Sequence, residues 1–123
     1  QYITPDDMKA KIDAKEDMIL LSVQTKDSYK EDGHLHGSIE TKAYPANTED
    51  LRKRLDKVTD KLTENDLPIY VMCMEGKGGA ENAISYYVNE KKIDQTRFYI
   101  IEGGIKGWPF PEMLESSKTE AEE

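Results

Sequence analysis

The chain has 123 residues, of which 37% are hydrophobic and 34% charged, a composition typical of one folded domain with a single core. Its formal net charge of −8 argues against nucleic acid and anionic membranes as partners, because both attract basic surfaces. No apolar run is long enough to span a bilayer, and the lone cysteine, Cys73, excludes an internal disulfide and a cysteine-rich zinc site.

The first part of the chain predicts two helical segments and two strands. Thr4 is a favourable N-cap and Pro5 suits the first helical position, so a helix is expected to begin there. Residues 18–23 form an apolar run of strand length. Residues 26–32 then predict a short helix or turn, and a further short strand is expected to begin at Ser38.

The second part continues the alternation of helices and strands. Thr48 caps a predicted helix in which apolar residues recur every three or four positions, namely Leu51, Leu55, Val58 and Leu62. The charges of residues 52–61 in this helix are expected to form a solvated face. Residues 67–73 are the clearest buried strand, residues 75–79 a tight loop before another helix, and residues 97–102 a last strand. The alternation predicts an α/β domain with a mainly parallel sheet.

Cys73 stands at the end of its predicted strand, where sites form in open α/β sheets. The residues that follow it and lead into the next helix are Met74, Glu75, Gly76, Lys77, Gly78 and Gly79. Glycines let the backbone curl with its N–H groups inward, and such a nest at a helix N-terminus binds anions and favours a thiolate. The pattern predicts a nucleophilic Cys73 in an anion-binding loop, to which Lys77 adds a positive charge. The alternative is that Cys73 is a small core residue and the glycines form only a turn.

Other kinds of site are less well supported by the sequence. A nucleotide-phosphate loop requires glycine where Val71 stands and serine or threonine where Gly78 stands, and the dinucleotide fingerprint fails on spacing. His34 and His36 form an H-x-H pair, which we interpret as structural or solvent-facing histidines of a turn, so no metal site is expected. Trp108 is expected to pack in the core rather than to bind a ligand.

The chain resembles the single-domain rhodaneses, the thiosulfate sulfurtransferase family, in three segments that occur in the family's order. The first comprises residues 20–24, then Tyr29, then Gly-His-Leu-His-Gly-Ser-Ile over residues 33–39. The second is the strand that ends in Cys73, with its glycine-rich loop and helix. The third is Glu-Gly-Gly-Ile-Lys-Gly-Trp over residues 102–108. Three motifs in this order are more specific than any one of them.

The resemblance implies a rhodanese-like three-layer domain over residues 1–115, with a mainly parallel sheet of about five strands flanked by helices. Residues 116–123 are expected to form an acidic disordered tail. The implied activity moves a sulfane sulfur from thiosulfate or another donor to a thiophilic acceptor, such as cyanide or a thiol, through a persulfide on Cys73. Residues 74–79 would bind the substrate, and no metal or organic cofactor is needed. We expect a monomer with small-molecule partners and no contact with nucleic acid or membrane.

Two departures from the family pattern bear on this activity. The family's first strand ends in Asp-Val-Arg, whereas Ser22-Val23-Gln24 stands here, so two charged groups are replaced by neutral ones. The family's loop carries an arginine where this chain has Gly78, and Glu75 adds a negative charge near the thiol. A non-catalytic sulfur-carrier, redox-sensing or protein-binding module is therefore the alternative function.

A phosphatase or arsenate reductase is a third hypothesis, which we disfavour because its loop requires an arginine at the position of Gly79. The compartment is open on the sequence alone. A lone thiol suits a reducing environment, so the cytoplasm is favoured, but a signal or anchor segment before Gln1 is compatible with the sequence.

Overall fold

The protein is built on a five-stranded parallel sheet, in a computed structural model that describes residues 1–75 and 77–115. The strand order is β1-β6-β5-β2-β4, and all four pairings are parallel. The strands are β1 (Tyr2–Ile3), β2 (Ile19–Val23), β4 (Ile39–Glu40), β5 (Ile69–Cys73) and β6 (Phe98–Ile101). A separate antiparallel pair joins β3 (His34–Leu35) to β7 (Leu114–Glu115).

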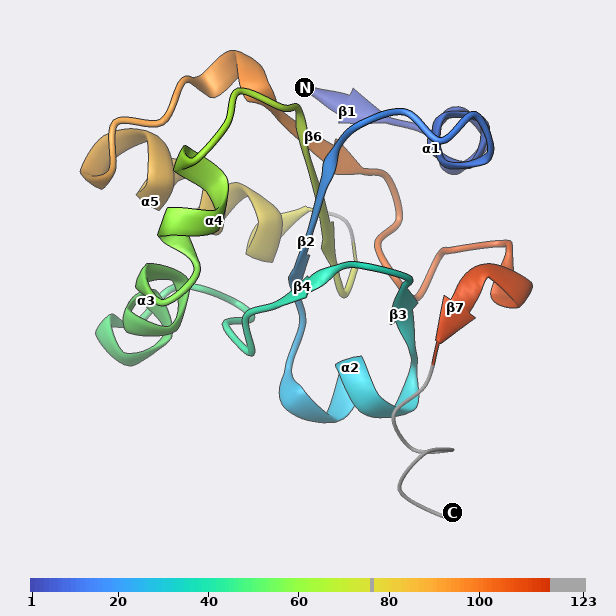
Figure 1. The fold of residues 1–123 in the computed structure, drawn as a ribbon. Helices are drawn as coiled ribbons and strands as arrows, with labels where there is room; N and C mark the ends of the chain where they lie inside the picture. The colour runs from blue at the N-terminus through green and yellow to red at the C-terminus, as the bar shows by residue number, and fades with distance from the viewer. Residues whose placement is uncertain (76, 116–123) are drawn as a thin grey trace.

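Helices cover both faces of this sheet (Figure 1). On one side lie α3 (Glu49–Asp56), α4 (Thr59–Thr63) and α5 (Gly78–Glu90), and on the other lies α1 (Pro5–Asp13). A short helix, α2 (Lys26–Glu31), follows the carboxyl end of β2, and two 3₁₀ turns span Gln95–Arg97 and Pro111–Met113. The expected three-layer α/β fold with about five parallel strands is confirmed. The predicted tail, residues 116–123, lies outside the described residues.

Threonine caps fix where three of the helices begin. The side chain of Thr4 accepts a hydrogen bond from the amide of Asp7, and Thr25 and Thr48 cap α2 and α3 in the same way. The single helix expected after Thr48 is wrong, because α3 ends at Asp56 and a separate α4 begins at Thr59. The apolar spacing does not show this break, since the buried residues on both sides of it still point to the same core.

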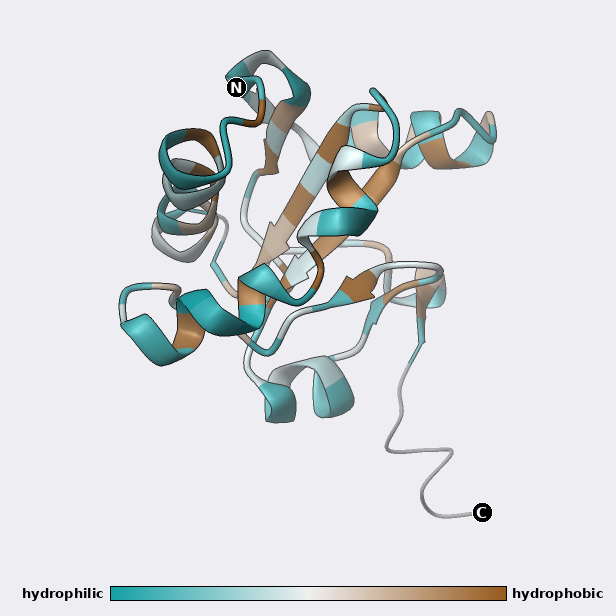
Figure 2. Ribbon diagram, turned by 60° about the vertical axis from the view of Figure 1, so that its left-hand side comes forward, coloured by the Kyte–Doolittle hydropathy of each residue, from teal (hydrophilic) through white to brown (hydrophobic). Residues whose placement is uncertain are grey.

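Each face of the sheet has its own hydrophobic core. Strand β5 is buried along its whole length and contributes alternate side chains to both cores. One core lies under α3, α4 and α5, and the other lies under α1 and the segment around Trp108, which is 7% exposed. Figure 2 shows hydrophobic residues along the central strands and hydrophilic ones on the outer sides of the helices. In the part of the chain that the structure describes, no helix combines the length and apolar character needed to cross a membrane.

Candidate functional site

Cys73 is the last residue of β5 and lies at the carboxyl edge of the sheet. It is paired in register with Val23 of β2 and is 1% exposed. At Cys73 the sheet holds the backbone on the β2 side only, because the pairing of β5 with β6 ends at Val71. The Cys73 thiol therefore lies at the edge where sites form in parallel sheets, and it is buried there.

Helix α5 begins within the residues predicted to be a loop. The loop was expected to reach Gly79, but Gly78 and Gly79 are already the first residues of α5. Lys77 occupies the N-cap position, and its side chain makes no capping hydrogen bond. The first N–H groups of a helix have no intrahelical partner and carry the positive end of the helix dipole. The strand end that bears Cys73 is thus joined to an anion-attracting helix terminus by only a few residues.

The predicted binding residues differ in exposure. Met74 is half-buried, whereas Glu75, Lys77 and Gly78 are exposed and Gly79 is buried. Gly76 lies outside the described residues. The side chains of opposite charge at positions 75 and 77 therefore both stand at the surface of the same short segment.

A second turn holds this segment by its carbonyl groups. The amide of Ile105 donates to the carbonyl of Cys73 at 2.8 Å, and the amide of Lys106 donates to the carbonyl of Met74 at 3.1 Å. The turn closes tightly, because a Cβ at Gly107 would lie 2.9 Å from the carbonyl oxygen of Gly103. The glycine-rich motif before Trp108 thus supports the cysteine loop. Sequence reasoning missed this role and also missed Lys106, an exposed cation beside the loop.

Tyr44 is another contact that the sequence did not indicate. Its ring packs against Gly79, where an added Cβ would lie 2.5 Å from a ring carbon of Tyr44 and 3.6 Å from the Cβ of Cys73. Asn82 of α5 donates a hydrogen bond to the carbonyl of Pro45 at 3.0 Å. These contacts join the loop before α3 to the start of α5. The only sequence signal for the contact was the glycine itself.

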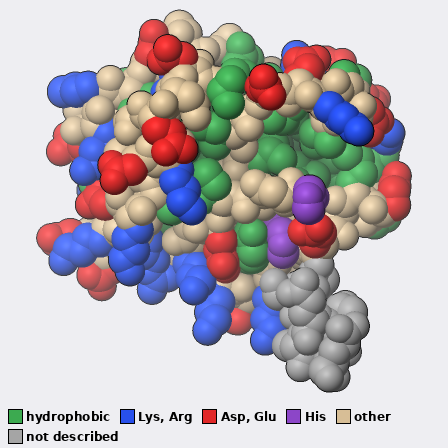
Figure 3. Space-filling view, in the orientation of Figure 1, with side chains coloured by type: hydrophobic (Ala, Val, Ile, Leu, Met, Phe, Trp, Pro, Cys, Tyr) green, Lys and Arg blue, Asp and Glu red, His purple; other side chains and the backbone are tan. Residues whose placement is uncertain are grey.

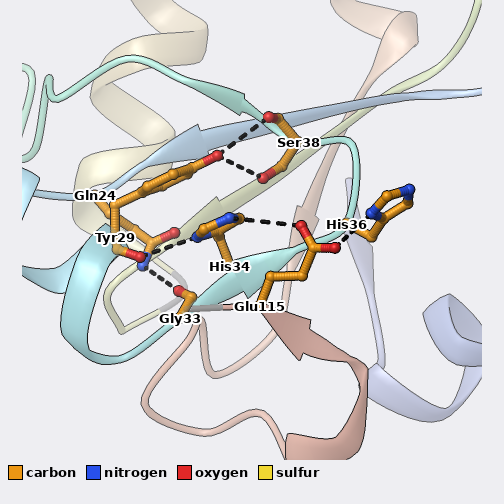
Figure 4. Close-up of polar contacts among 7 residues, drawn as sticks. All are labelled: Gln24, Tyr29, Gly33, His34, His36, Ser38 and Glu115. Atoms are coloured by element: carbon orange, nitrogen blue, oxygen red, sulfur yellow. Dashed lines mark hydrogen bonds and ion pairs between the residues drawn. The ribbon is translucent and has the colours of Figure 1, made fainter. Parts of the chain in front are cut away.

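The neutral groups at the end of β2 form a buried hydrogen-bonded network. Ser22 donates to the side-chain oxygen of Gln24 at 2.7 Å, and both residues are 1% exposed. The Gln24 amide nitrogen donates to the hydroxyl of Ser28 at 3.0 Å and to the carbonyl of Gly33 at 3.1 Å, the second of these being drawn in Figure 4. The two neutral side chains are therefore mutually satisfied, as buried polar groups must be.

The two histidines of the H-x-H pair differ: His34 is buried in β3, whereas His36 is exposed in the turn that follows β3. His34 stacks on the ring of Tyr29 with centroids 3.7 Å apart, and its Nδ1 lies 3.0 Å from the Tyr29 carbonyl oxygen. His36 is exposed, and its Nδ1 lies 2.6 Å from the carboxylate of Glu115 (Figure 4). The Tyr29 contacts join β3 to α2, and the Glu115 contact joins the turn after β3 to β7. Among the described residues, no three histidine, cysteine, aspartate or glutamate side chains are grouped to hold a metal ion.

The family model described as a rhodanese-like domain matches residues 4–109 of this chain. No curated protein matches this chain. Among solved structures, the rhodanese-like domain of an Anabaena protein is 16% identical, with a TM-score of 0.70 over 96% of this chain and 80% of that one. A rhodanese-like domain protein from Staphylococcus aureus is 22% identical, with a TM-score of 0.64 over 94% and 97% of the two chains. A Saccharomyces cerevisiae homolog of single-domain rhodanese and the Cdc25 phosphatase catalytic domain is 16% identical, with a TM-score of 0.61 over 88% and 78%.

Proposed function

Since this chain belongs to the rhodanese-like domain family, we propose that it transfers sulfane sulfur through a persulfide on Cys73. The family is associated with sulfurtransferases and related modules, and thiosulfate is the donor we propose. The observation that carries the proposal is the placement of Cys73. It ends the central strand β5 just before the uncapped N-terminus of α5. That terminus offers N–H groups to an anion without competition from a capping side chain.

The proposed reaction needs no external oxidant or reductant. The Cys73 thiolate attacks the outer sulfur of thiosulfate, a sulfur–sulfur bond forms to the enzyme, and the bond to the sulfonate breaks with sulfite leaving. A thiolate acceptor then attacks the outer sulfur of the persulfide. The bond to the Cys73 sulfur breaks, and Cys73 returns as a thiolate. Both steps involve anions, so the positive helix terminus favours each of them.

The residues around the thiol have distinct proposed roles. The backbone N–H groups of residues 74–79 bind the anionic end of the donor, and Lys77 supplies the positive side-chain charge nearest to Cys73 in sequence. Lys106 supplies a second cation, because its own amide is bonded to the carbonyl of Met74. Glu75 opposes both lysines and weakens the hold on thiosulfate.

The depth of Cys73 supports a second candidate function. A thiol that is 1% exposed in a loop without arginine suits a sulfur carrier, redox sensor or protein-binding module as well as an enzyme. A phosphatase function is disfavoured despite the phosphatase-related neighbour among the structures. Position 79, where that chemistry requires arginine, is a buried glycine with the Tyr44 ring against it.

The two candidates are separated by a direct assay. The protein is incubated with thiosulfate and its intact mass is measured. An added sulfur that is lost on treatment with cyanide, together with thiocyanate release, is expected for the parent and not for Cys73→Ser. If no sulfur is added with thiosulfate or with a low-molecular-weight persulfide as donor, the sulfurtransferase and the sulfur carrier both fail, and a redox sensor or protein-binding module remains.

A further inference from the structure

A groove between the end of β4 and helix α3 is lined by three cations. Its walls are formed by Lys42, Arg54 and Lys57, with Thr41 and Val58 between them and one carboxylate, Glu40. The groove has a volume of about 370 Å³. Figure 3 shows Lys and Arg side chains gathered along the lower left border of the molecule, over α3 and towards α2. We call Lys42, Arg54 and Lys57 the basic triad.

The charges of the basic triad are not neutralised within the described chain. Among residues 1–75 and 77–115, none of the three forms an ion pair with an aspartate or glutamate. Arg54 instead donates to the backbone carbonyl of Lys42 at 2.7 Å. The chain as a whole has a net charge of −8, so surplus acidic groups were available for pairing. A solvated helix face, as expected from the sequence, does not account for the position of Lys42, which lies outside α3.

The backbone conformation of Lys42 is a second unusual feature of the basic triad. Its φ of 58° lies in the left-handed region, which is unfavourable for a residue other than glycine. Arg54 and Lys57 are favoured near the C-terminus of α3 by the helix dipole, but that explanation does not apply to Lys42. A strained lysine is thus held beside two further cations.

The basic triad and Cys73 are connected by one short loop. The segment after Lys42 reaches Tyr44, whose ring packs against Gly79 at the start of α5. Gly79 in turn lies next to Cys73, since a Cβ at Gly79 would be 3.6 Å from the Cβ of Cys73. A protein interface of ordinary size covers about 800 Å² on each partner. A partner of that size seated on the basic triad can also reach the segment around Tyr44 and the start of α5.

We propose that the basic triad docks an acidic protein that exchanges sulfur with Cys73. This inference rests on the proposed function, and it names the acceptor class as a protein thiol flanked by carboxylates. The three cations attract such a partner and orient its thiol towards the loop. Nucleic acid fits less well, because a polyanion extends beyond the triad onto the acidic remainder of the surface. An acidic patch on a protein has a limited area and complements the positive charge of the basic triad alone.

The test compares two short fluorescent peptides, each with one cysteine, in which the flanking residues are either glutamates or glutamines. The parent protein is loaded with persulfide, and transfer to each peptide is followed by mass spectrometry. At low ionic strength the glutamate peptide is expected to react about tenfold faster, and salt should remove the difference. Neutralising the triad (Lys42→Gln, Arg54→Gln, Lys57→Gln) should abolish the preference and leave transfer to a small uncharged thiol unchanged.

The matched control neutralises Lys9, Lys11 and Lys15, which lie in and just after α1 on the other face of the sheet. Lys15 shares the left-handed backbone of Lys42, so both triple variants alter one such lysine. The control should keep the preference for the glutamate peptide. Equal rates for the two peptides, or equal losses in both triple variants, would overturn the proposal.

Binding of the peptides is also measured separately from sulfur transfer, by fluorescence anisotropy with the Cys73→Ser variant. If no persulfide forms on the parent but the glutamate peptide still binds through the triad, the proposed activity fails and the docking surface stands. If neither peptide binds and the persulfide transfers normally, the docking surface fails and the activity stands. Tighter binding of an oligonucleotide of equal charge would overturn the assignment to an acidic protein.

Discussion

The ring of Tyr44 lies where a side chain at position 79 would begin. A Cβ built on Gly79 falls 2.5 Å and 2.7 Å from two ring carbons of Tyr44, closer than such contacts tolerate. The glycine thus allows the loop before α3 to close onto the first turn of α5. The same contact sets the boundary of the cysteine loop, because Gly79 is buried next to Cys73 while its neighbour Gly78 is exposed.

We predict that Gly79→Ala destabilises the fold by about 1–3 kcal/mol, because the methyl group must displace the Tyr44 ring. Urea unfolding followed by circular dichroism measures the change. Gly78→Ala is the matched control, since nothing lies within 4 Å of its added Cβ. It should be neutral or stabilising by about 0.5 kcal/mol, as alanine suits a helix better than glycine. Equal stabilities of the two variants would contradict the steric role of Tyr44.

We predict that Gly78→Arg raises thiosulfate turnover. Position 78 corresponds to the arginine of the family's loop, and open space surrounds the Cβ that the substitution adds. A guanidinium there can hold a sulfonate through two hydrogen bonds. The expected result is a KM for thiosulfate lower by about tenfold, equivalent to one charge-assisted contact. Gly78→Gln controls for side-chain bulk, and a gain of the same size with glutamine would argue against an electrostatic effect.

We predict that Lys77→Ala weakens thiosulfate use more than Glu75→Ala does, because the donor loses its nearest side-chain cation. Removing Glu75 should instead strengthen thiosulfate binding, since it takes away a like charge. Lys106→Ala tests the second cation beside the loop and should lie between the two. Steady-state kinetics over a range of salt concentrations measure these effects. Activity of Lys77→Ala equal to that of the parent protein would count against its role.

The pH dependence of stability should reflect Asp56. The hydroxyl of Tyr86 and the Lys91 ammonium, which lies 3.1 Å away, lower the pKa of Asp56. A lowered folded-state pKa contributes stability above the unfolded pKa of about 4 and loses it as pH falls through the folded value. Asp56→Asn should therefore flatten the pH profile of urea midpoints below pH 5. A profile parallel to that of the parent would show that the exposed cluster contributes little.

Sequence reasoning predicted the elements whose signals are local. Thr4 and Thr48 cap helices where expected, and the apolar run before Cys73 is the central strand. Strands β1 and β3 were not predicted, because two residues leave no periodic pattern, whereas β4, equally short, was expected to begin at Ser38 and begins at Ile39. The break after Asp56 was hidden for the opposite reason, because the apolar spacing continues across it.

Only the part of the candidate site that is continuous in sequence was predicted. Cys73 and the glycines after it are consecutive in sequence, so their proximity required no tertiary information. Tyr44 and Lys106 approach the same loop from segments about 30 residues away on either side, and no motif shared with the loop marks them. The roles predicted for residues 74–79 stay predictions until sulfur transfer is measured.

The last prediction concerns the buried pair at the end of β2. Gln24→Arg introduces the family's charged residue without its aspartate, so a cation is buried beside the neutral hydroxyl of Ser22. We expect a loss of about 3 kcal/mol or more, because an uncompensated buried charge retains its full desolvation cost. Adding Ser22→Asp should recover most of that loss by restoring the ion pair. Ser22→Asp alone should also destabilise, and the three variants with the parent form a double-mutant cycle measured by urea unfolding. If the losses are instead additive in the double variant, side chains at positions 22 and 24 do not form an ion pair in this fold. The neutral hydrogen-bonded network would then have a structural role that the family's charged pair cannot fill.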